Sequence, residues 1–232
     1  TSDVSSQLFK WGHSMVSIWS SHLDPNDTTT IDISPASKGN GNYYPSNFSA
    51  QQAFYHYFEG GDTSKGYTVN PITNLPYTPQ LVKRGDYARV VSQFWADGPR
   101  SETPPGHWFY ILNKVSDNPL FVKKYEGVGP TLSNLEWDVK SYFALGGAMH
   151  DAAIAAWSVK GWYDSPRPIS ALRLMSQLGQ CTDSLLPHYH RGGLPLIPGY
   201  IELIQAGDSL AGASNENVNK IKLFTWKGFH YI

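Results

Sequence analysis

The chain has 232 residues, which is long enough for one large domain or two small ones with a sizeable buried core. Its 18 Lys and Arg residues nearly balance its 19 Asp and Glu residues, so no field of one sign favours nucleic acid or an anionic membrane, and we expect no nucleic-acid partner. Aromatic residues reach 14% against 16% charged residues, which favours an ordered, tightly packed protein. The single cysteine, Cys181, excludes an internal disulfide.

Two sequence triplets bear on the location of the protein. Asn26-Asp27-Thr28 and Asn47-Phe48-Ser49 match the acceptor pattern for N-glycosylation and lie in polar, turn-rich sequence, which favours a secreted or extracellular protein. The chain begins with Thr1 instead of Met, which fits a processed or incomplete product. No apolar run is long enough to cross a bilayer, so we expect no membrane span.

The first predicted helix runs from Val4 to Trp19, where apolar residues recur at steps of three and four. Residues 23–80 are instead dense in Asn, Asp, Gly, Pro, Ser and Thr, and only Ala50 to Phe58 has a helical pattern. A loop-rich excursion of this length within a compact domain either clamps a partner surface or wraps the surface of its own domain.

More helices are predicted after this excursion. A periodic segment runs from about Asp86 to Trp95, and another helix covers residues 107–112, following the turn-forming run Thr103-Pro104-Pro105-Gly106. A long helix extends from Thr131, a capping residue type, to about Tyr163.

Proline and glycine mark the helix boundaries in the last third of the chain. Pro166 and Pro168 end the long helix, and Pro168 opens the next one, which closes at Gly179. We expect a short helix from Tyr200 to Ala206 and no convincing series of alternating strands. The pattern predicts a mainly α fold in a single domain, residues 1–232.

The segment from Phe143 to Trp157 is made almost entirely of small and apolar residues. It is too apolar for a helix with one face in water, so we expect a helix buried on most sides. Its Gly and Ala residues would let neighbouring helices approach closely.

Lys160 and Arg167 stand at the end of this long segment, seven positions apart. Seven residues of α-helix make nearly two turns, roughly 10.5 Å of rise, so both side chains would leave one face and converge on one anion. Arginine supplies a planar fork for oxyanions and lysine a compact point charge. The alternative is that the two cations belong to an ordinary solvated face.

Two groups of residues carry a resemblance to a known family. Phe94-Trp95-Ala96-Asp97-Gly98-Pro99 precedes Thr103-Pro104-Pro105-Gly106-His107-Trp108, and Ala148-Met149-His150-Asp151-Ala152-Ala153-Ile154 leads to Lys160 and Arg167-Pro168. With these motifs the chain resembles the vanadium-dependent haloperoxidases and the type 2 phosphatidic acid phosphatases. The resemblance covers roughly residues 86–204 and implies an all-α, helical-bundle fold.

The resemblance also implies roles for particular side chains. Lys160 and Arg167 would donate hydrogen bonds to the oxygens of vanadate, the implied cofactor, or of phosphate. Asp151 would lie near the site and orient a cationic ligand. Trp162 would line the pocket or pack in the core. In the peroxidase reaction the partners would be hydrogen peroxide, a halide and an organic acceptor.

The sequence departs from the family pattern after Arg167. The expected Pro-Ser-Gly-His motif, and the Ser-Arg motif with a later His, do not occur between Arg167 and Ile232, while Pro105-Gly106-His107 only partly mimics the first of them. We therefore interpret the chain as the front portion of a longer protein, completed by a missing C-terminal half or by a second chain.

Other functions stay open at this point. A phosphatase of the same fold would bind a phosphoryl group with the same two cations. A non-catalytic structural or assembly protein would keep only the helical scaffold, and a homo-oligomer is compatible with either. His188 and His190 have no third ligand at matching spacing, so we predict no metal site there.

Overall fold

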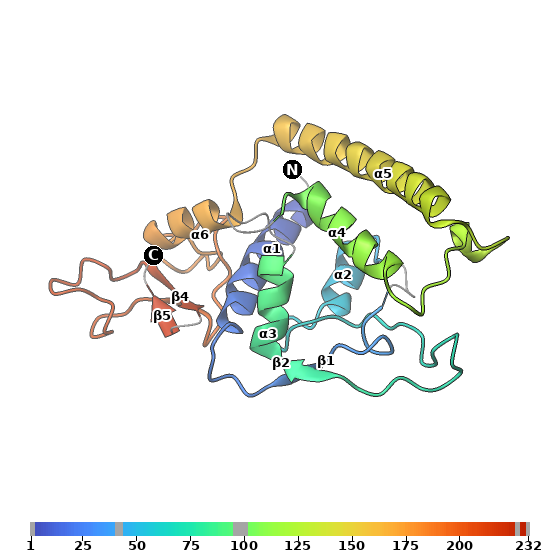
Figure 1. The fold of residues 1–232 in the computed structure, drawn as a ribbon. Helices are drawn as coiled ribbons and strands as arrows, with labels where there is room; N and C mark the ends of the chain where they lie inside the picture. The colour runs from blue at the N-terminus through green and yellow to red at the C-terminus, as the bar shows by residue number, and fades with distance from the viewer. Residues whose placement is uncertain (1–2, 40–43, 95–101, 226–227, 231–232) are drawn as a thin grey trace. The chain divides into compact units, whose positions relative to one another are not determined.

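The computed structural model describes residues 3–39, 44–94, 102–225 and 228–230. The chain forms two compact units, which are described separately below. The first unit comprises Thr1–Val91 and Pro166–Ile232, and the second comprises Ser92–Ser165. The fold is mainly α, as the sequence predicts (Figure 1). A single domain over residues 1–232 stays a prediction.

The first unit begins with helix α1, Asp3–Ser21, close to the predicted first helix. Its inner face carries Ile18, which is fully buried, together with buried Ser14 and Ser17. The hydroxyl of Ser14 donates to the backbone carbonyls of Lys10 and Trp11, both at 2.9 Å. These bonds within the helix let the hydroxyl of Ser14 lie in the core with its hydrogen-bonding needs met.

The C-terminal part of the first unit contains helix α6, Pro168–Gln177, and a small antiparallel sheet. The strands are β3 (Ile201–Leu203), β4 (Ile221–Thr225) and β5 (Gly228–His230), in the order β3-β4-β5. Helices α1 and α6 both pack against β4. The core of this region consists of buried apolar residues from α6, the following loops and the sheet: Ala171, Leu172, Met175, Cys181, Leu194, Ile201, Ile221 and Leu223.

The predicted helix from Tyr200 to Ala206 is wrong, because its centre is strand β3. Ile201 pairs with Leu223 and Leu203 with Ile221 across the antiparallel ladder. Both strands present alternate residues to the core, so tertiary pairing decides the structure of a short apolar run whose local pattern is ambiguous. The expectation of no convincing strand series is corrected by the same sheet.

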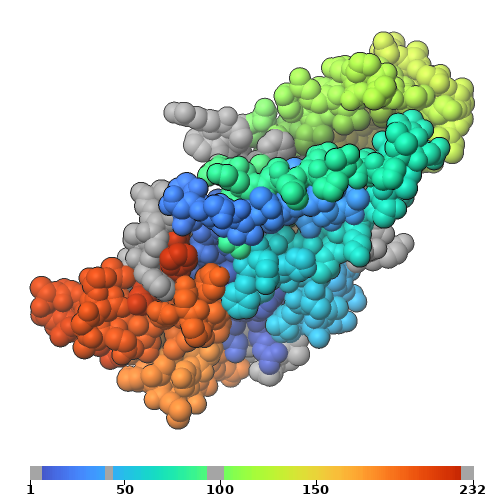
Figure 2. Space-filling view, turned by 90° about the horizontal axis from the view of Figure 1, so that it is seen from below, coloured from blue at the N-terminus to red at the C-terminus, as the bar shows by residue number. Residues whose placement is uncertain are grey.

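The loop-rich part of the first unit is held by a short ladder near its ends. Strand β1, Thr30–Asp32, pairs antiparallel with β2, Leu81–Lys83. Between them lies helix α2, Phe48–Phe54, whose cap Asn47 accepts a hydrogen bond from the backbone N–H of Ala50 at 2.9 Å. Orange atoms of the C-terminal segment lie against cyan atoms of this loop-rich part (Figure 2), and the rings of Phe58 and Tyr200 are 5.6 Å apart.

Arg84 joins this excursion to the segment that follows α1. It opens helix α3, Arg84–Arg89, which continues as a π-helical turn, Val90–Phe94. Its Nε lies 2.6 Å from Oδ2 of Asp27, and one of its terminal nitrogens donates to the carbonyls of Phe58 and Glu59 at 3.2 Å each. One guanidinium thus joins three segments that are far apart in sequence.

The second unit contains helices α4, Pro104–Ser116, and α5, Asn134–Tyr163, with a 3-10 turn, Tyr125–Gly127, between them. Ser133 caps α5, two residues after the predicted Thr131. The helices contact each other through Phe109 and Tyr142, whose ring centroids are 5.1 Å apart, and through a 2.9 Å hydrogen bond from Trp137 Nε1 to Ser116. Among the helices of the described residues, none is long and apolar enough to span a membrane.

Candidate functional site

Lys160 lies in the last turn of α5, with its side chain exposed to solvent. Its Nζ is 5.8 Å from the ring centroid of Trp157, three residues earlier. This distance is within the range of a cation–π contact, which orients the ammonium group along the helix surface. The group keeps its N–H donors available for an anion.

Arg167 lies outside α5 and caps the start of α6 with extended backbone angles, φ −61° and ψ 147°. Helix α5 has already ended at Tyr163, where Asp164 takes a left-handed conformation with φ 41°. Each residue that precedes Pro166 or Pro168 is kept out of the helical region by the proline ring. The prediction that Lys160 and Arg167 leave one continuous helix face is therefore wrong.

The two cations belong to different units, because the second unit ends at Ser165 and the first resumes at Pro166. Arg167 is exposed, like Lys160. Within the described residues neither cation forms an ion pair. Each of the two groups, an ammonium and a guanidinium, is by itself a cationic donor that suits a tetrahedral oxyanion.

Asp151 and Trp162 lie on the exposed surface of α5. Oδ1 of Asp151 is 3.3 Å from Nδ1 of His150, and both side chains are largely in solvent. The Trp162 side chain is 84% exposed, so the expected core packing is absent from its unit. In the part of the chain that the structure describes, no group of three or more His, Cys, Asp or Glu residues is placed to hold a metal ion.

The expectation that Phe143 to Trp157 is buried is wrong for this structure. Phe143 is 85% exposed and Trp157 is 73% exposed. Apolar side chains lie all round α5, and its contacts with α4 occur near its start, at Trp137 and Tyr142. Composition predicts that this helix is too apolar to face water, but it does not predict which segments would cover it.

A known family model matches part of the chain. The model of the VCPO second helical-bundle domain matches residues 140–183. The match supports a haloperoxidase-like family for this part, which includes Asp151, Lys160, Trp162 and Arg167. Searches of the curated proteins and of the solved structures find no significant match. Of the residues that carry the resemblance, 95–99 lie outside the described part of the structure.

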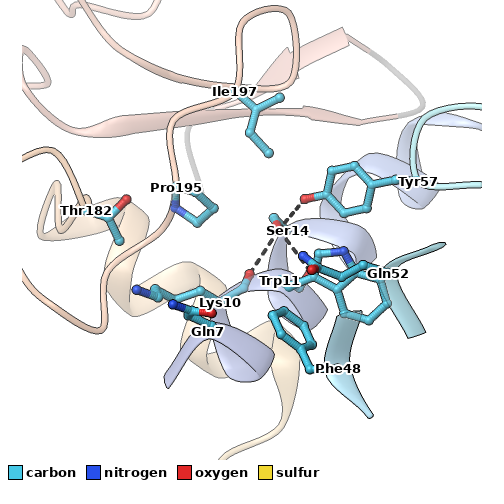
Figure 3. Close-up of a pocket in the computed structure, with 10 residues that line it drawn as sticks. All are labelled: Gln7, Lys10, Trp11, Ser14, Phe48, Gln52, Tyr57, Thr182, Pro195 and Ile197. Atoms are coloured by element: carbon cyan, nitrogen blue, oxygen red, sulfur yellow. Dashed lines mark hydrogen bonds between the residues drawn. The ribbon is translucent and has the colours of Figure 1, made fainter. Parts of the chain in front are cut away.

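A pocket in the first unit was not predicted from the sequence. It lies between α1, α2 and the loops that follow α6 (Figure 3). Ten described residues line it: Gln7, Lys10, Trp11, Ser14, Phe48, Gln52, Tyr57, Thr182, Pro195 and Ile197. The apolar periodicity of the first predicted helix indicates only that Trp11 faces the core. The other lining residues come from segments whose proximity is set by tertiary structure, so no local pattern signals the site.

Proposed function

We propose that the chain is a haloperoxidase-like segment in which Lys160 and Arg167 each serve as a donor to a tetrahedral oxyanion. The observation that supports this most is the family match to residues 140–183, because that stretch includes both cations. Their exposure and their lack of ion pairs among the described residues leave both groups available for a ligand. Because α5 ends between the two residues, each is proposed as a donor by itself.

In this proposal the role of each side chain follows from its position. The ammonium of Lys160 and the guanidinium of Arg167 each donate hydrogen bonds to an oxyanion. Asp151 lies nine residues before Lys160 on α5, about 13.5 Å along the helix axis and on the opposite face, so it does not lie beside an anion held by Lys160. Bound vanadate supplies the chemistry that activates hydrogen peroxide for oxidation of a halide, with an organic acceptor as the final substrate. Two donors leave several oxyanion lone pairs without partners, so the proposal includes further donors beyond these residues.

The test is vanadate binding, measured by the line width of the vanadium-51 resonance as the full chain is added. Lys160→Gln and Arg167→Gln are compared with Lys140→Gln on the same α5 and Arg173→Gln on α6. A charge-assisted hydrogen bond contributes about 1.5–3 kcal/mol, so each site variant should weaken binding by about ten- to a hundredfold. The controls should bind as the parent does. Equal binding by all five proteins, or no binding by the parent, contradicts the proposal.

The same donors suit phosphate, so a phosphatase is tested by the same variants. Hydrolysis of a phosphomonoester that vanadate inhibits, and that Lys160→Gln and Arg167→Gln abolish, would favour that activity. Vanadate-dependent oxidation of bromide by the parent would favour the peroxidase.

A non-catalytic assembly protein is the second candidate, and one observation favours it. The apolar side chains of α5, with Phe143 and Trp162 among the most exposed, form a surface typical of a protein interface more than of a free helix. A parent chain that self-associates through α5 and shows neither anion binding nor turnover would favour this candidate.

A further inference from the structure

The pocket in the first unit is open to solvent and has the size of a small-molecule site. Its volume is about 510 Å³, within the range of about 300–1,000 Å³ that is usual for such sites. The walls come from α1, from the α2 region and from the loops after α6, all within one compact unit. It is separate from the residues proposed to bind the oxyanion.

One side of the pocket is aromatic and apolar. The ring of Trp11 is 6.1 Å from that of Tyr57 with an interplanar angle of 16°, and 5.9 Å from that of Phe48 at 80°. Figure 3 shows Pro195 and Ile197 facing these rings across the pocket. A flat apolar group inserted here would contact aromatic rings on one side and aliphatic carbons on the other.

The aromatic side is held in place by hydrogen bonds. The hydroxyl of Tyr57 donates to Oγ of Ser14, and Trp19 Nε1 donates to the carbonyl of Tyr57 at 3.2 Å. Ser14 is fully buried in α1. The orientation of Tyr57 is therefore fixed before any ligand arrives, which reduces the entropy lost on binding.

The other side of the pocket is polar and positively charged. In Figure 3 the ends of Lys10 and Gln7 lie below Thr182, away from Tyr57. Lys10 is the one ionisable cation among the described lining residues, and no Asp or Glu lines the pocket with it. Its ammonium group has no side-chain hydrogen bond or ion pair within the described part of the chain. A half-buried cation without a counterion favours an anionic ligand.

We propose that this pocket binds a small aromatic carboxylate, with the ring beside Trp11 and Tyr57 and the carboxylate on Lys10. We propose a ligand with one negative charge because Lys10 is the one cation among the described lining residues. It follows from the two-sided lining and does not rest on the proposed oxyanion chemistry, so either can fail without the other.

The first experiment compares 2-naphthoate with its neutral analogue 2-naphthamide, by isothermal titration calorimetry on the full chain. The charged end should make the carboxylate bind about tenfold more tightly than the amide. Lys10→Gln should remove this preference and leave amide binding unchanged. The control is Lys65→Gln, an exposed lysine elsewhere in the same unit, which should keep the preference.

The second experiment tests the aromatic side. Trp11→Leu should weaken binding of both ligands by about tenfold, because it removes an aromatic ring that the ligand's ring would contact. The control is Trp157→Leu on the exposed surface of α5, which should bind both ligands as the parent does. If Trp11→Leu does not fold, Lys10→Gln still decides the question, because it leaves the ring cluster intact. No saturable heat with millimolar 2-naphthoate, equal binding of the two ligands by the parent, or the same loss in Lys65→Gln overturns the proposal.

Discussion

The hydroxyl of Tyr57 donates a hydrogen bond to Oγ of Ser14, which lies 43 positions earlier in the chain. The hydroxyl of Ser14 in turn donates to the backbone carbonyls of Lys10 and Trp11 in α1. Burial raises the pKa of Tyr57 above its ordinary value, so the phenol remains a donor at physiological pH. The loop-rich excursion is thus joined to α1 at the wall of the pocket.

Ser14→Ala should lower the free energy of unfolding by about 1–3 kcal/mol, because it leaves the Tyr57 hydroxyl without an acceptor. Urea denaturation measures the loss. Ser20→Ala is the matched control, since Ser20 lies on the same helix and its hydroxyl donates to the carbonyl of Val16 at a more exposed position. It should change stability by no more than about 0.5 kcal/mol.

Tyr57→Phe should partly rescue Ser14→Ala, because it removes the unpaired hydroxyl. The double variant should then be more stable than the sum of the single losses predicts. Strictly additive losses would show that the two groups are not coupled.

His22 should make the first unit less stable in mild acid. Burial, followed by the nearby charge of Arg84, lowers the pKa of His22 from 6.5 to about 4. Between these values the unfolded chain binds a proton that the folded chain does not, so stability falls as the pH drops from about 6.5 towards 4. Allowing for solvent screening, the loss should reach about 2 kcal/mol by pH 4.

The measurement is urea denaturation of the parent and of His22→Gln across this pH range. Gln retains an N–H that can donate to the carbonyl of Phe58, which is 2.9 Å from Nε2 of His22. The difference in stability between the two proteins should shrink as the pH falls. A difference that does not change with pH would rule out His22 as the titrating group.

Gly179→Ala should destabilise the protein by more than about 2 kcal/mol. Gly179 has φ +68°, and an added Cβ would lie 2.2 Å from the carbonyl oxygen of Asn219, a backbone atom that cannot move aside alone. Gly12→Ala is the control in the same unit, because it lies within α1 with nothing within 4 Å of the added carbon. That change should stabilise the helix by about 0.5–1 kcal/mol. Thermal unfolding of both variants provides the comparison.

Polar substitutions on α5 should reduce binding of a hydrophobic dye. Phe143→Gln and Trp162→Gln each remove an exposed aromatic ring from a helix that is apolar all round, and Gln maintains helix propensity. Tyr67→Gln is the control, because Tyr67 is exposed on the loop-rich part of the other unit. The fluorescence of anilinonaphthalene sulfonate should fall for the α5 variants and not for the control. Equal fluorescence for all of them would mean that α5 is covered.

Helix boundaries could be predicted where the sequence has a capping residue, a proline or a glycine at the helix end. Thr103 caps α4 by accepting a bond from the N–H of Gly106, and Pro104 occupies the first turn. Gly179 follows the end of α6 with the positive φ that glycine permits. In each case the deciding interaction lies within four residues, so the local pattern contains it.

Features that depend on distant residues could not be predicted in this way. Strand β3 forms by pairing with β4, which begins about 20 residues later at Ile221. The pocket forms where Trp11 of α1 and the loops after α6 lie around one space. The proposed cations show a different error. The seven-residue spacing of Lys160 and Arg167 predicts one shared helix face, but Pro166 lies between them and Asp164 ends the helix in a left-handed conformation. Pro166 signals the end of the helix in the sequence itself, so the shared face could have been excluded without the structure.

Cys181 is the single cysteine of the chain, and its side chain has no exposed surface. It sits in the core between α6 and the sheet, so an alkylating reagent reaches its sulfur only when that core opens. The rate of alkylation in native buffer therefore reports the breathing of the first unit directly, with no engineered label and no competing thiol.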